Sequence, residues 1–497
     1  MQHKPQAPVV SGNRPPGNGG VSEQRGLLGR IVGYGISRTI VEALLAGRGL
    51  LLAGILGPEM FGIWALFRIA LRYLAFAGLG LLRGLEFEVS RSSEQTQDNP
   101  PRRTYWGEVG AGHTLILYGA LSLLAAAATL PGEHVAGIAF LGVALGLLPD
   151  RLWSYGITYL RAAGGLRRFA VVELLNAALQ VGACVLLALH WGVAGAFVGF
   201  AVANVTSIAL LIGRTPLRPR FEPRSVYRLI QIGFPVALMG ILSATLATVD
   251  RLLVGAFLGL GGLGLYAFAV SVSELGVSFA AIVRTVILKD VYEQSRVPRE
   301  DGASPFVLDH ALSGFATLGP PLAGLFALML PPLIALFTAE FSSVASVAQL
   351  LLFAGLIQGF NNVAVLGVVA DGLQRRLPLV SVAAVGVNVV LALAAISFGL
   401  GLLGVAAASF LTRLLQAAAI LVLLLRASTA SGIVAAIARL LLPAVWCAAA
   451  VYAIGHLLPF AGIRTLALQL LCYTVALFVL APAMLGALAP RPVRRTL

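Results

Sequence analysis

The chain has 497 residues, of which 58% are hydrophobic and only 11% are charged, and its mean hydropathy is +0.91. Soluble domains have about 25% charged residues, so this composition excludes a soluble globular protein and indicates a membrane protein. The formal net charge of +14 could suit nucleic acid. The basic residues, however, lie in short segments between apolar runs, which is the pattern of membrane topology rather than of a nucleic-acid surface.

The remaining bulk features exclude other classes of protein. Residues 1–30 are rich in Pro, Gly and Asn and lack the apolar core of a signal peptide, so they predict a disordered cytoplasmic tail. The cysteines Cys184, Cys447 and Cys472 all lie within apolar runs, and the histidines are scattered. We therefore expect no disulfide framework, no metal site and no cofactor.

The predicted elements are apolar helices that each need about 20 residues to cross a bilayer. The sequence predicts an all-α polytopic membrane protein of about fourteen transmembrane helices, with both termini on one side. The expected spans are 31–56, 60–82, 108–130, 135–160, 170–189, 192–213, 229–257, 263–287, 308–336, 344–370, 378–398, 402–425, 433–457 and 463–486.

The loops between these spans alternate in charge. One set holds most of the 35 basic residues, whereas the alternate set, short loops such as GPEM, HWG and LGLGG, holds Arg464 alone. The positive-inside rule then places the basic set in the cytoplasm and predicts a multi-pass protein with both termini cytoplasmic.

Two stretches resemble each other across the chain. RGLLLAGILGPEMFGIWAL, from Arg48, and DRLLVGAFLGLGGLGLYAF, from Asp250, share a G-x4-G-x-aromatic-A frame. We interpret this as a repeat of two six-helix lobes, and such repeats place a substrate site between them. The predicted divisions are an N-lobe at 31–213, a basic linker at 214–228, a C-lobe at 229–425, two extra helices within 426–486, and a tail at 487–497. The alignment also sets Arg48 opposite Asp250, and Arg72 opposite Glu274.

Two enzyme motifs can be set aside. Residues 259–264 match G-x-G-x-x-G, but they form a short turn between spans, without the strand and helix that a dinucleotide site needs. The sequence contains no G-x-x-x-x-G-K-[ST] motif. Spacings such as Gly142 to Gly146 are typical of helix packing.

Ionisable residues within spans are costly, so each is a candidate functional residue. Some have a structural explanation. Arg38 and Glu42 could pair on one helix face, and Arg284 and Arg439 could reach the cytoplasmic interface. Glu173 is expected to be interfacial. Asp150 and Arg151 are adjacent and are expected to seek partners on other helices.

The central arginines are harder to explain by pairing, because arginines outnumber acids within the spans. We predict a hydrated cationic cavity between the lobes, with salt bridges between individual residues as the competing explanation. Arginine suits phosphate because its planar fork binds two oxygens and stays charged. The candidate residues for the anion are Arg38, Arg48, Arg68, Arg72, Arg251 and Arg413. Gln358, Asn361 and Asn362 are candidates for sugar contacts, and Asp250 and Glu274 for ion or proton coupling.

The span count, LGPEMFGIWAL after the first span, VDRLLVGAFLGLGGLGLYAFA at the seventh, and YLRAAGGLRRFAVVELLNA at 159–177 together resemble the polysaccharide transporter family. This family comprises O-antigen and exopolysaccharide repeat-unit flippases within the multidrug/oligosaccharidyl-lipid/polysaccharide superfamily. The resemblance implies a protein of the bacterial cytoplasmic (inner) membrane, in which undecaprenyl-pyrophosphate-linked oligosaccharide moves to the outer leaflet by alternating access of two lobes. It also implies that Arg48, Arg68, Arg72 and Arg251 receive the pyrophosphate, and that a polysaccharide polymerase or export machinery is a candidate partner.

Other functions remain open. A lipid II flippase has the same span count, and a cation-coupled drug or metabolite antiporter has the same fold, although an acidic or apolar cavity would be expected there. A membrane glycosyltransferase should have a large external loop, and every predicted external loop is short. The sequence therefore predicts a non-enzymatic, secondary-type transporter.

Overall fold

The structure is a computed structural model that describes residues 19–94, 100–129, 134–164, 166–211, 215–295, 306–426 and 429–488. The regular elements in these ranges are α-helices and short 3-10 helices. In chain order they are α1 (Gly19–Leu74), η1 (Ala75–Gly78), α2 (Leu81–Glu94), α3 (Pro100–Ala127), α4 (His134–Ala162), α5 (Leu166–Ala209), α6 (Pro223–Ser295), α7 (Phe306–Phe337), η2 (Ala339–Val344), α8 (Ala345–Ala370), η3 (Gln374–Arg376), α9 (Leu377–Ser397), α10 (Gly401–Leu424), α11 (Ala430–Leu457) and α12 (Ile463–Leu488).

Within the described ranges, ten helices are long and apolar enough to cross a membrane. Three of the longest, α1, α5 and α6, contain breaks in helical geometry, at Gly57, at Trp191 and Gly192, and at Gly259. Each break lies in a turn predicted between two spans. The all-helical, multi-pass architecture is therefore confirmed, whereas the count of fourteen spans stays a prediction.

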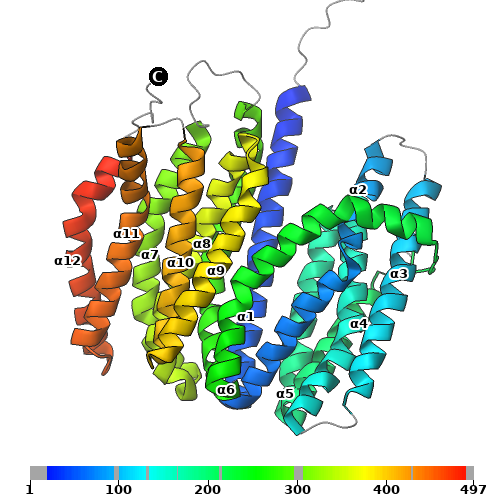
Figure 1. Cartoon of the computed structure of the whole chain (residues 1–497), viewed down its shortest axis with the longest axis horizontal. Helices are drawn as coiled ribbons and strands as arrows, with labels where there is room; N and C mark the ends of the chain where they lie inside the picture. The colour runs from blue at the N-terminus through cyan, green and yellow to red at the C-terminus, as the bar shows by residue number, and fades with distance from the viewer. Residues whose placement is uncertain are drawn as a thin grey trace, which may run out of the picture.

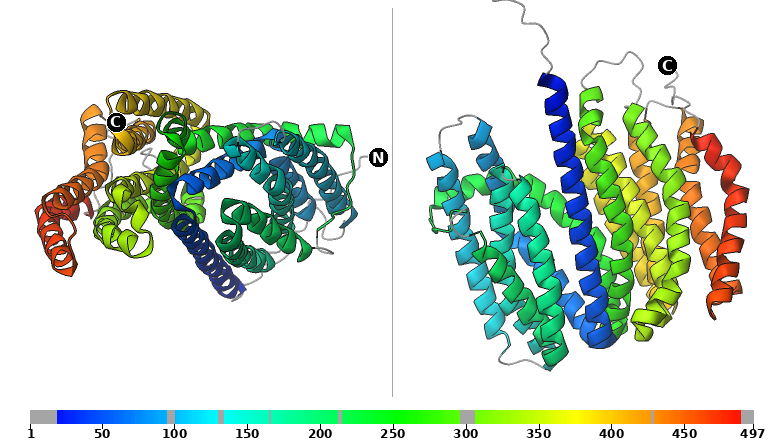
Figure 2. Two further views of the ribbon diagram at one scale, coloured as in Figure 1. Left: turned by 90° about the horizontal axis from the view of Figure 1, so that it is seen from below. Right: turned by 180° about the vertical axis from the view of Figure 1, so that it is seen from behind.

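The helices run side by side, and the described chain starts and ends on one face of the molecule (Figures 1 and 2). The first half of α1 runs away from that face, and its second half returns after the break at Gly57 (Figure 1). Of the predicted disordered tail at 1–30, residues 1–18 lie outside the described residues, and residues 19–30 differ from the prediction because they form the beginning of α1.

The repeat seen in the sequence has a counterpart in the backbone. Gly57 has φ 68° and ψ 174°, and Gly259 has φ 75° and ψ 179°. This region is accessible almost only to glycine, because a Cβ atom would clash with the backbone. The first glycine of each frame therefore makes the same reversal in both halves of the chain.

The second glycine of each frame brings the two reversals into contact. A Cβ atom added to Gly62 would lie 2.1 Å from the Leu260 carbonyl oxygen, and one added to Gly264 would lie 1.8 Å from the Pro58 carbonyl oxygen. Only glycine allows backbones to approach this closely. The two hairpins made by α1 and α6 are thus packed directly against each other at their turns.

The predicted span 60–82 ends earlier than expected. The helix stops at Leu74, and after η1 the chain bends at Leu79 and Gly80, which both have positive φ angles (48° and 85°). Gly80 packs so closely against the carbonyl group of Gly233 in α6 that a Cβ atom at position 80 would clash with it. The segment after the bend, predicted as the start of a basic loop, forms the helix α2.

The predicted linker at 214–228 is also shorter than expected, because α6 begins at Pro223, a residue suited to the first turn of a helix. The segment before Pro223 packs on α3 and α4. The Tyr155 hydroxyl donates to the Pro216 carbonyl (2.7 Å), and the Arg220 amide donates to the Glu108 carbonyl (3.0 Å).

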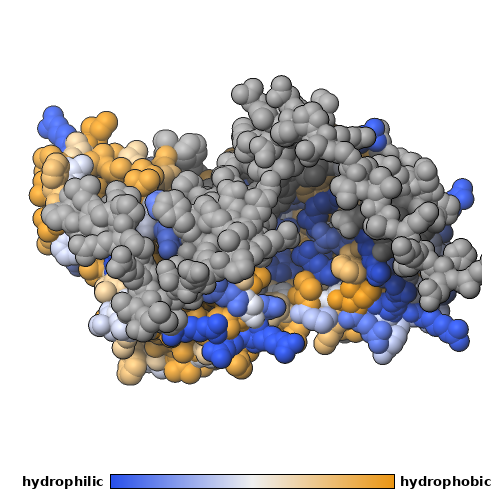
Figure 3. Space-filling model, turned by 90° about the horizontal axis from the view of Figure 1, so that it is seen from above, coloured by the Kyte–Doolittle hydropathy of each residue, from blue (hydrophilic) through white to orange (hydrophobic). Residues whose placement is uncertain are grey.

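The helices form two groups, with α2 to α5 in one and α7 to α12 in the other (Figure 2). The hairpin turns of α1 and α6 meet between them, whereas the beginning of α6 extends across α2 toward α3 (Figure 1). Seen from the face where α1 begins, hydrophilic side chains gather in a recessed area of the surface (Figure 3). This arrangement places the charged residues of α1 and α6 between the two groups.

The Gly62 contact predicts a specific sensitivity. Replacing Gly62 with Ala should destabilise the protein by about 1–3 kcal/mol, because the added methyl group forces the two hairpins apart. Thermal unfolding in detergent measures the effect. Gly119→Ala is the matched control, since a Cβ atom at Gly119 has no neighbour within 4 Å. Equal unfolding midpoints for the two variants would contradict the proposed packing role.

Candidate functional site

Arg48 is a buried cation in the first half of α1, with 5% of its surface exposed. Its guanidinium carbon lies 5.4 Å from the centre of the Trp64 ring, within the range of a cation–π contact. Its Nη1 donates a hydrogen bond to the Gln180 side-chain oxygen on α5. Three helical segments thus fix the position of this charge. The sequence predicts a function for Arg48 but does not predict these partners.

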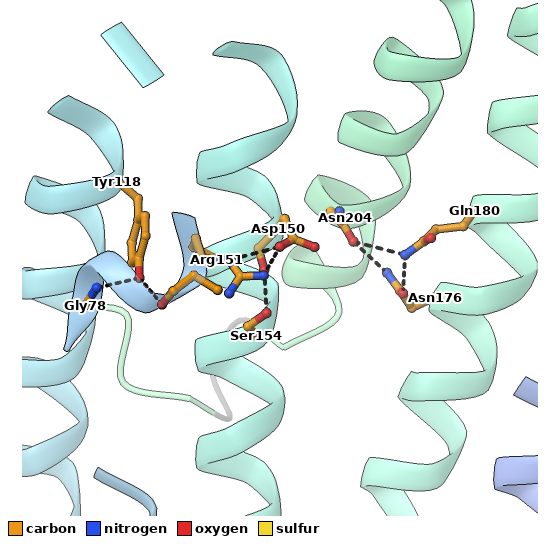
Figure 4. A network of polar contacts seen from close by, with 9 residues as sticks. Gly78, Tyr118, Asp150, Arg151, Ser154, Asn176, Gln180 and Asn204 are labelled. Atoms are coloured by element: carbon orange, nitrogen blue, oxygen red, sulfur yellow. Dashed lines mark hydrogen bonds and ion pairs between the residues drawn. The ribbon is translucent and has the colours of Figure 1, made fainter. Parts of the chain in front are cut away.

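Gln180 is the first member of a buried amide network (Figure 4). The Gln180 Nε2 donates to the Asn176 side-chain oxygen (2.8 Å), and the Asn176 Nδ2 donates to Ser207 Oγ (2.9 Å) and to the Asn204 side-chain oxygen (3.1 Å). None of these residues is predicted as a site residue from the sequence. A signal was present, because each interrupts an apolar run in α5.

Arg68 lies over a cluster of aromatic rings that joins α1 to α5. Its guanidinium carbon is 5.3 Å from the centre of the Phe200 ring. Phe67 packs at 4.8 Å from Phe197, whose ring stacks with that of Trp64 at 6.1 Å. The rings fit against α4 because they meet glycines there, including Gly142 and Gly146, as the packing interpretation of that pair predicts.

Arg72 is exposed, unlike Arg48, although it lies in the part of α1 that contacts α6. The charges that act on it are those of Arg251, Glu274 and Arg68. The next residue, Tyr73, forms a hydrogen bond of 2.8 Å with Thr248, which shows that α1 and α6 are in contact here. An arginine exposed in this position requires water or an anion around it.

Asp250 is the buried counterpart of Arg48 in the second half of the chain, with 2% of its surface exposed. Its Oδ2 accepts hydrogen bonds from the hydroxyls of Tyr266 (2.9 Å) and Ser409 (2.9 Å), and its Oδ1 accepts from the Arg251 backbone amide (2.8 Å). The Arg251 side chain donates to the Ala247 carbonyl instead (2.8 Å).

The two charges of the repeat therefore have equivalent partners of opposite character. Trp64 and Tyr266 occupy the aromatic position of the shared frame. The Trp64 ring faces the cation Arg48, whereas the Tyr266 hydroxyl donates to the anion Asp250. In each half, the buried charge on the first helix of the hairpin therefore contacts the aromatic residue at the equivalent position of the second helix.

Arg413 is buried near Asp250, with 8% of its surface exposed, and it experiences the charges of Asp250, Arg251 and Glu274. The polar residues of α8 lie on two sides of that helix. Asn361 is buried and donates to the Arg413 carbonyl (3.3 Å) and to Gln416 (3.2 Å), so its amide nitrogen is used within the protein. Gln358 and Asn362 are partly exposed and bond to each other (3.3 Å).

Arg68 thus lies within electrostatic range of both Arg48 and Arg72, and Arg251 and Glu274 lie within electrostatic range of Arg72. The side chains of Arg38 and Arg284 lie outside the described residues. Arg439 donates to Ser313 on α7 (3.4 Å), so it packs within the helices.

The expectation for Asp150 and Arg151 is wrong. The two side chains pair with each other, and the Arg151 Nε lies 2.9 Å from the Asp150 Oδ2 (Figure 4). Side chains one residue apart on a helix point in different directions, but the long arginine side chain folds back to its neighbour. This pair is therefore compensated locally.

Solved structures of membrane transporters share this fold. The lipid II flippase MurJ in an inward closed conformation matches with a TM-score of 0.68 at 15% identity, over 92% of this chain and 99% of that chain. An inward-facing multidrug resistance MATE transporter of the MOP superfamily matches with a TM-score of 0.59 at 17% identity, over 77% and 95%. A eukaryotic MATE transporter matches with a TM-score of 0.53 at 16% identity, over 87% and 100%. The fold is therefore that of the MOP transporters.

Within this class, the sequence profile of a family described as "Polysaccharide biosynthesis protein" matches residues 51–346, more than half of the chain. The chain belongs to this family, and the family resemblance seen in the sequence is confirmed. The comparison with curated protein sequences finds no match.

The hydrogen bonds to Asp250 predict that the protein becomes measurably less stable when one of the donors is removed. Tyr266→Phe should destabilise the protein by about 1.5–3 kcal/mol, because a hydrogen bond to a buried charge is lost. The unfolding midpoint in detergent measures the loss. Tyr452→Phe, at a residue 50% exposed on α11, is the control. If both variants unfold at the wild-type temperature, the Tyr266 bond contributes nothing.

Proposed function

We propose that the protein is a flippase that moves undecaprenyl-pyrophosphate-linked oligosaccharide repeat units across the bacterial inner membrane, for O-antigen, exopolysaccharide or capsule synthesis. The observation that carries the proposal is the cluster of Arg48, Arg68 and Arg72 between α1, α5 and α6. Arg48 and Arg68 are held by amide and aromatic groups, and Arg72 is exposed, so their charges are available to an anion. Membership of the polysaccharide biosynthesis family supports the substrate class.

The transport cycle follows from the two halves. We propose fourteen spans arranged as an N-lobe (31–213) and a C-lobe (229–425), with both termini in the cytoplasm and spans 13 and 14 added at 426–486. The lobes rock about their contacts so that the site between them faces each side of the membrane in turn. Substrate enters with its pyrophosphate near Arg72, because this cation is exposed and lies beside Arg251.

The remaining candidate residues receive roles in the same scheme. Gln358 and Asn362 are partly exposed, and amide groups suit the hydroxyls of a sugar. Asn361 supports them from the buried side, since it bonds to the neighbouring helix α10. Asp250 and Glu274 are the proposed sites of ion or proton coupling, and Arg38 and Arg413 extend the positive charge along the pathway.

A lipid II flippase is the second candidate function. The MurJ structure supports it, because MurJ matches over a larger share of this chain and with a higher TM-score than the two MATE transporters do. A cation-coupled antiporter is less well supported, because the cluster on α1 is basic. Polysaccharide polymerase or export proteins are proposed as partners.

Deletion of the gene separates the two candidate functions. The expected result is loss of surface polysaccharide and accumulation of lipid-linked repeat units on the cytoplasmic side, with peptidoglycan synthesis unchanged. Labelling of the repeat units in intact cells and in inverted vesicles measures the two pools. Unchanged surface polysaccharide would exclude the proposed substrate, and arrested peptidoglycan synthesis would establish lipid II as the substrate instead.

The cation cluster makes a second prediction. Arg72→Glu should abolish complementation of the deletion, because it replaces attraction of the pyrophosphate with repulsion. Arg72→Lys should restore transport only in part, since lysine keeps the charge but not the two-pronged geometry. Surface polysaccharide at matched expression is the measurement. Arg464→Glu, at an exposed residue in the first turn of α12, is the control that should complement fully.

A further inference from the structure

The hydrogen bonds of the amide network behind Arg48 are all donated in one direction, away from the cation. A guanidinium group has donors only, so Gln180 must present its oxygen to Arg48 and its nitrogen to Asn176. Asn176 then presents its nitrogen to Ser207 and Asn204. The oxygen of each successive amide therefore points toward the cation, and the partial charges of the chain all stabilise it.

This arrangement differs from the usual treatment of a buried charge, which is pairing with an opposite charge. Gln180, Asn176 and Asn204 are all buried and neutral. The carboxylates of Glu274 and Asp150 also act on Arg48, but Asp150 is paired with Arg151, and among the described residues no salt bridge joins either carboxylate to Arg48. Amide dipoles lower the energy of the cation without cancelling its unit charge.

Arg48 also retains unused hydrogen-bonding capacity. In the described part of the chain, its Nε has no hydrogen-bond partner, and neither does the Nδ2 of Asn204. An unpaired buried donor lowers the stability of a fold, so the network is not optimised for stability alone. An anion that approaches Arg48 would use both its charge and its free donor.

We propose that Gln180 is a positioning and charge-selecting residue of the substrate site. Backed by Asn176 and Asn204, it holds Arg48 in one orientation without an ion pair, so that its charge stays available to the diphosphate group of the lipid carrier. This inference rests on the proposed function and deepens it. Selectivity for an anion then comes from a neutral partner at a position where a carboxylate would form an ion pair and close the site.

Gln180→Glu distinguishes this role from a purely structural one. Glutamate has nearly the same shape and still accepts the Arg48 hydrogen bond. It cannot donate to Asn176 as Gln180 does, but rotation of the Asn176 amide turns its nitrogen toward the carboxylate and restores a hydrogen bond there. The added negative charge, however, neutralises the cation. A structural role predicts unchanged binding, whereas the proposed role predicts loss of anion affinity.

The test uses the purified full chain in detergent, with farnesyl pyrophosphate as the probe and farnesol as its uncharged counterpart. Wild-type protein should bind the pyrophosphate more tightly than farnesol. Gln180→Glu should weaken pyrophosphate binding about tenfold or more, as expected for a unit charge added near the bound anion, and leave farnesol binding unchanged. Calorimetry measures affinity, and thermal unfolding measures stability.

Two further variants sharpen the result. Asn176→Asp places the same charge one hydrogen bond further from Arg48 and should weaken binding less than Gln180→Glu does; it also serves if Gln180→Glu does not fold. Gln349→Glu is the matched control on α8, where the buried Gln349 donates to the Ala327 carbonyl (3.0 Å). This control should lose stability and keep its affinity for pyrophosphate.

The outcomes separate the two proposals. If wild-type protein prefers the pyrophosphate and Gln180→Glu binds it equally well, the inference about Gln180 is wrong and the proposed function stands. If wild-type protein shows no preference for the pyrophosphate over farnesol, the assignment of an anionic lipid to this site is itself overturned.

Discussion

The close approach of Gly62 and Gly264 is the contact on which the arrangement of the site depends. At these two glycines the backbones of α1 and α6 touch without intervening side chains. Gly57 and Gly259 make the reversals that present them. With the two hairpins fixed in this way, Arg48, Arg68 and Arg72 on α1 face the neighbourhood of Arg251 and Glu274 on α6.

The two halves of the repeat share the same hairpin geometry, but the buried charge is a cation in one half and an anion in the other. In one half, an aromatic ring and an amide hold the cation Arg48. In the other half, the hydroxyls of Tyr266 and Ser409 hold the anion Asp250. Both arrangements give the buried charge polar or polarisable neighbours, as a buried charge requires. They differ in the hydrogen-bonding capacity that the charged group has left. The Asp250 oxygens are engaged by donors, whereas Arg48 keeps a free donor.

The fold is shared with a lipid II flippase and with a multidrug resistance transporter, at identities of 15% and 17%. One scaffold therefore serves different transport classes, and the site must supply the specificity. In this chain the site residues of α1 and α5 are basic, aromatic and amide-bearing, and α6 adds the cation Arg251 and the acid Glu274. That chemistry is consistent with an anionic, lipid-linked substrate and with the polysaccharide biosynthesis family.

The sequence by itself determined the membrane class, the main helices, the turns at Gly57, Trp191–Gly192 and Gly259, and the identity of the arginines as candidates. These features are local, because hydropathy and glycine placement act over one span or one turn. The tertiary structure decided the rest. The bend at Leu79 and Gly80 depends on the contact with Gly233, and the pairing of Asp150 with Arg151 depends on a side-chain rotamer. The partnership of Arg48 with Gln180 joins residues 132 positions apart, and only the packing of α5 against α1 brings an amide rather than a carboxylate to that cation.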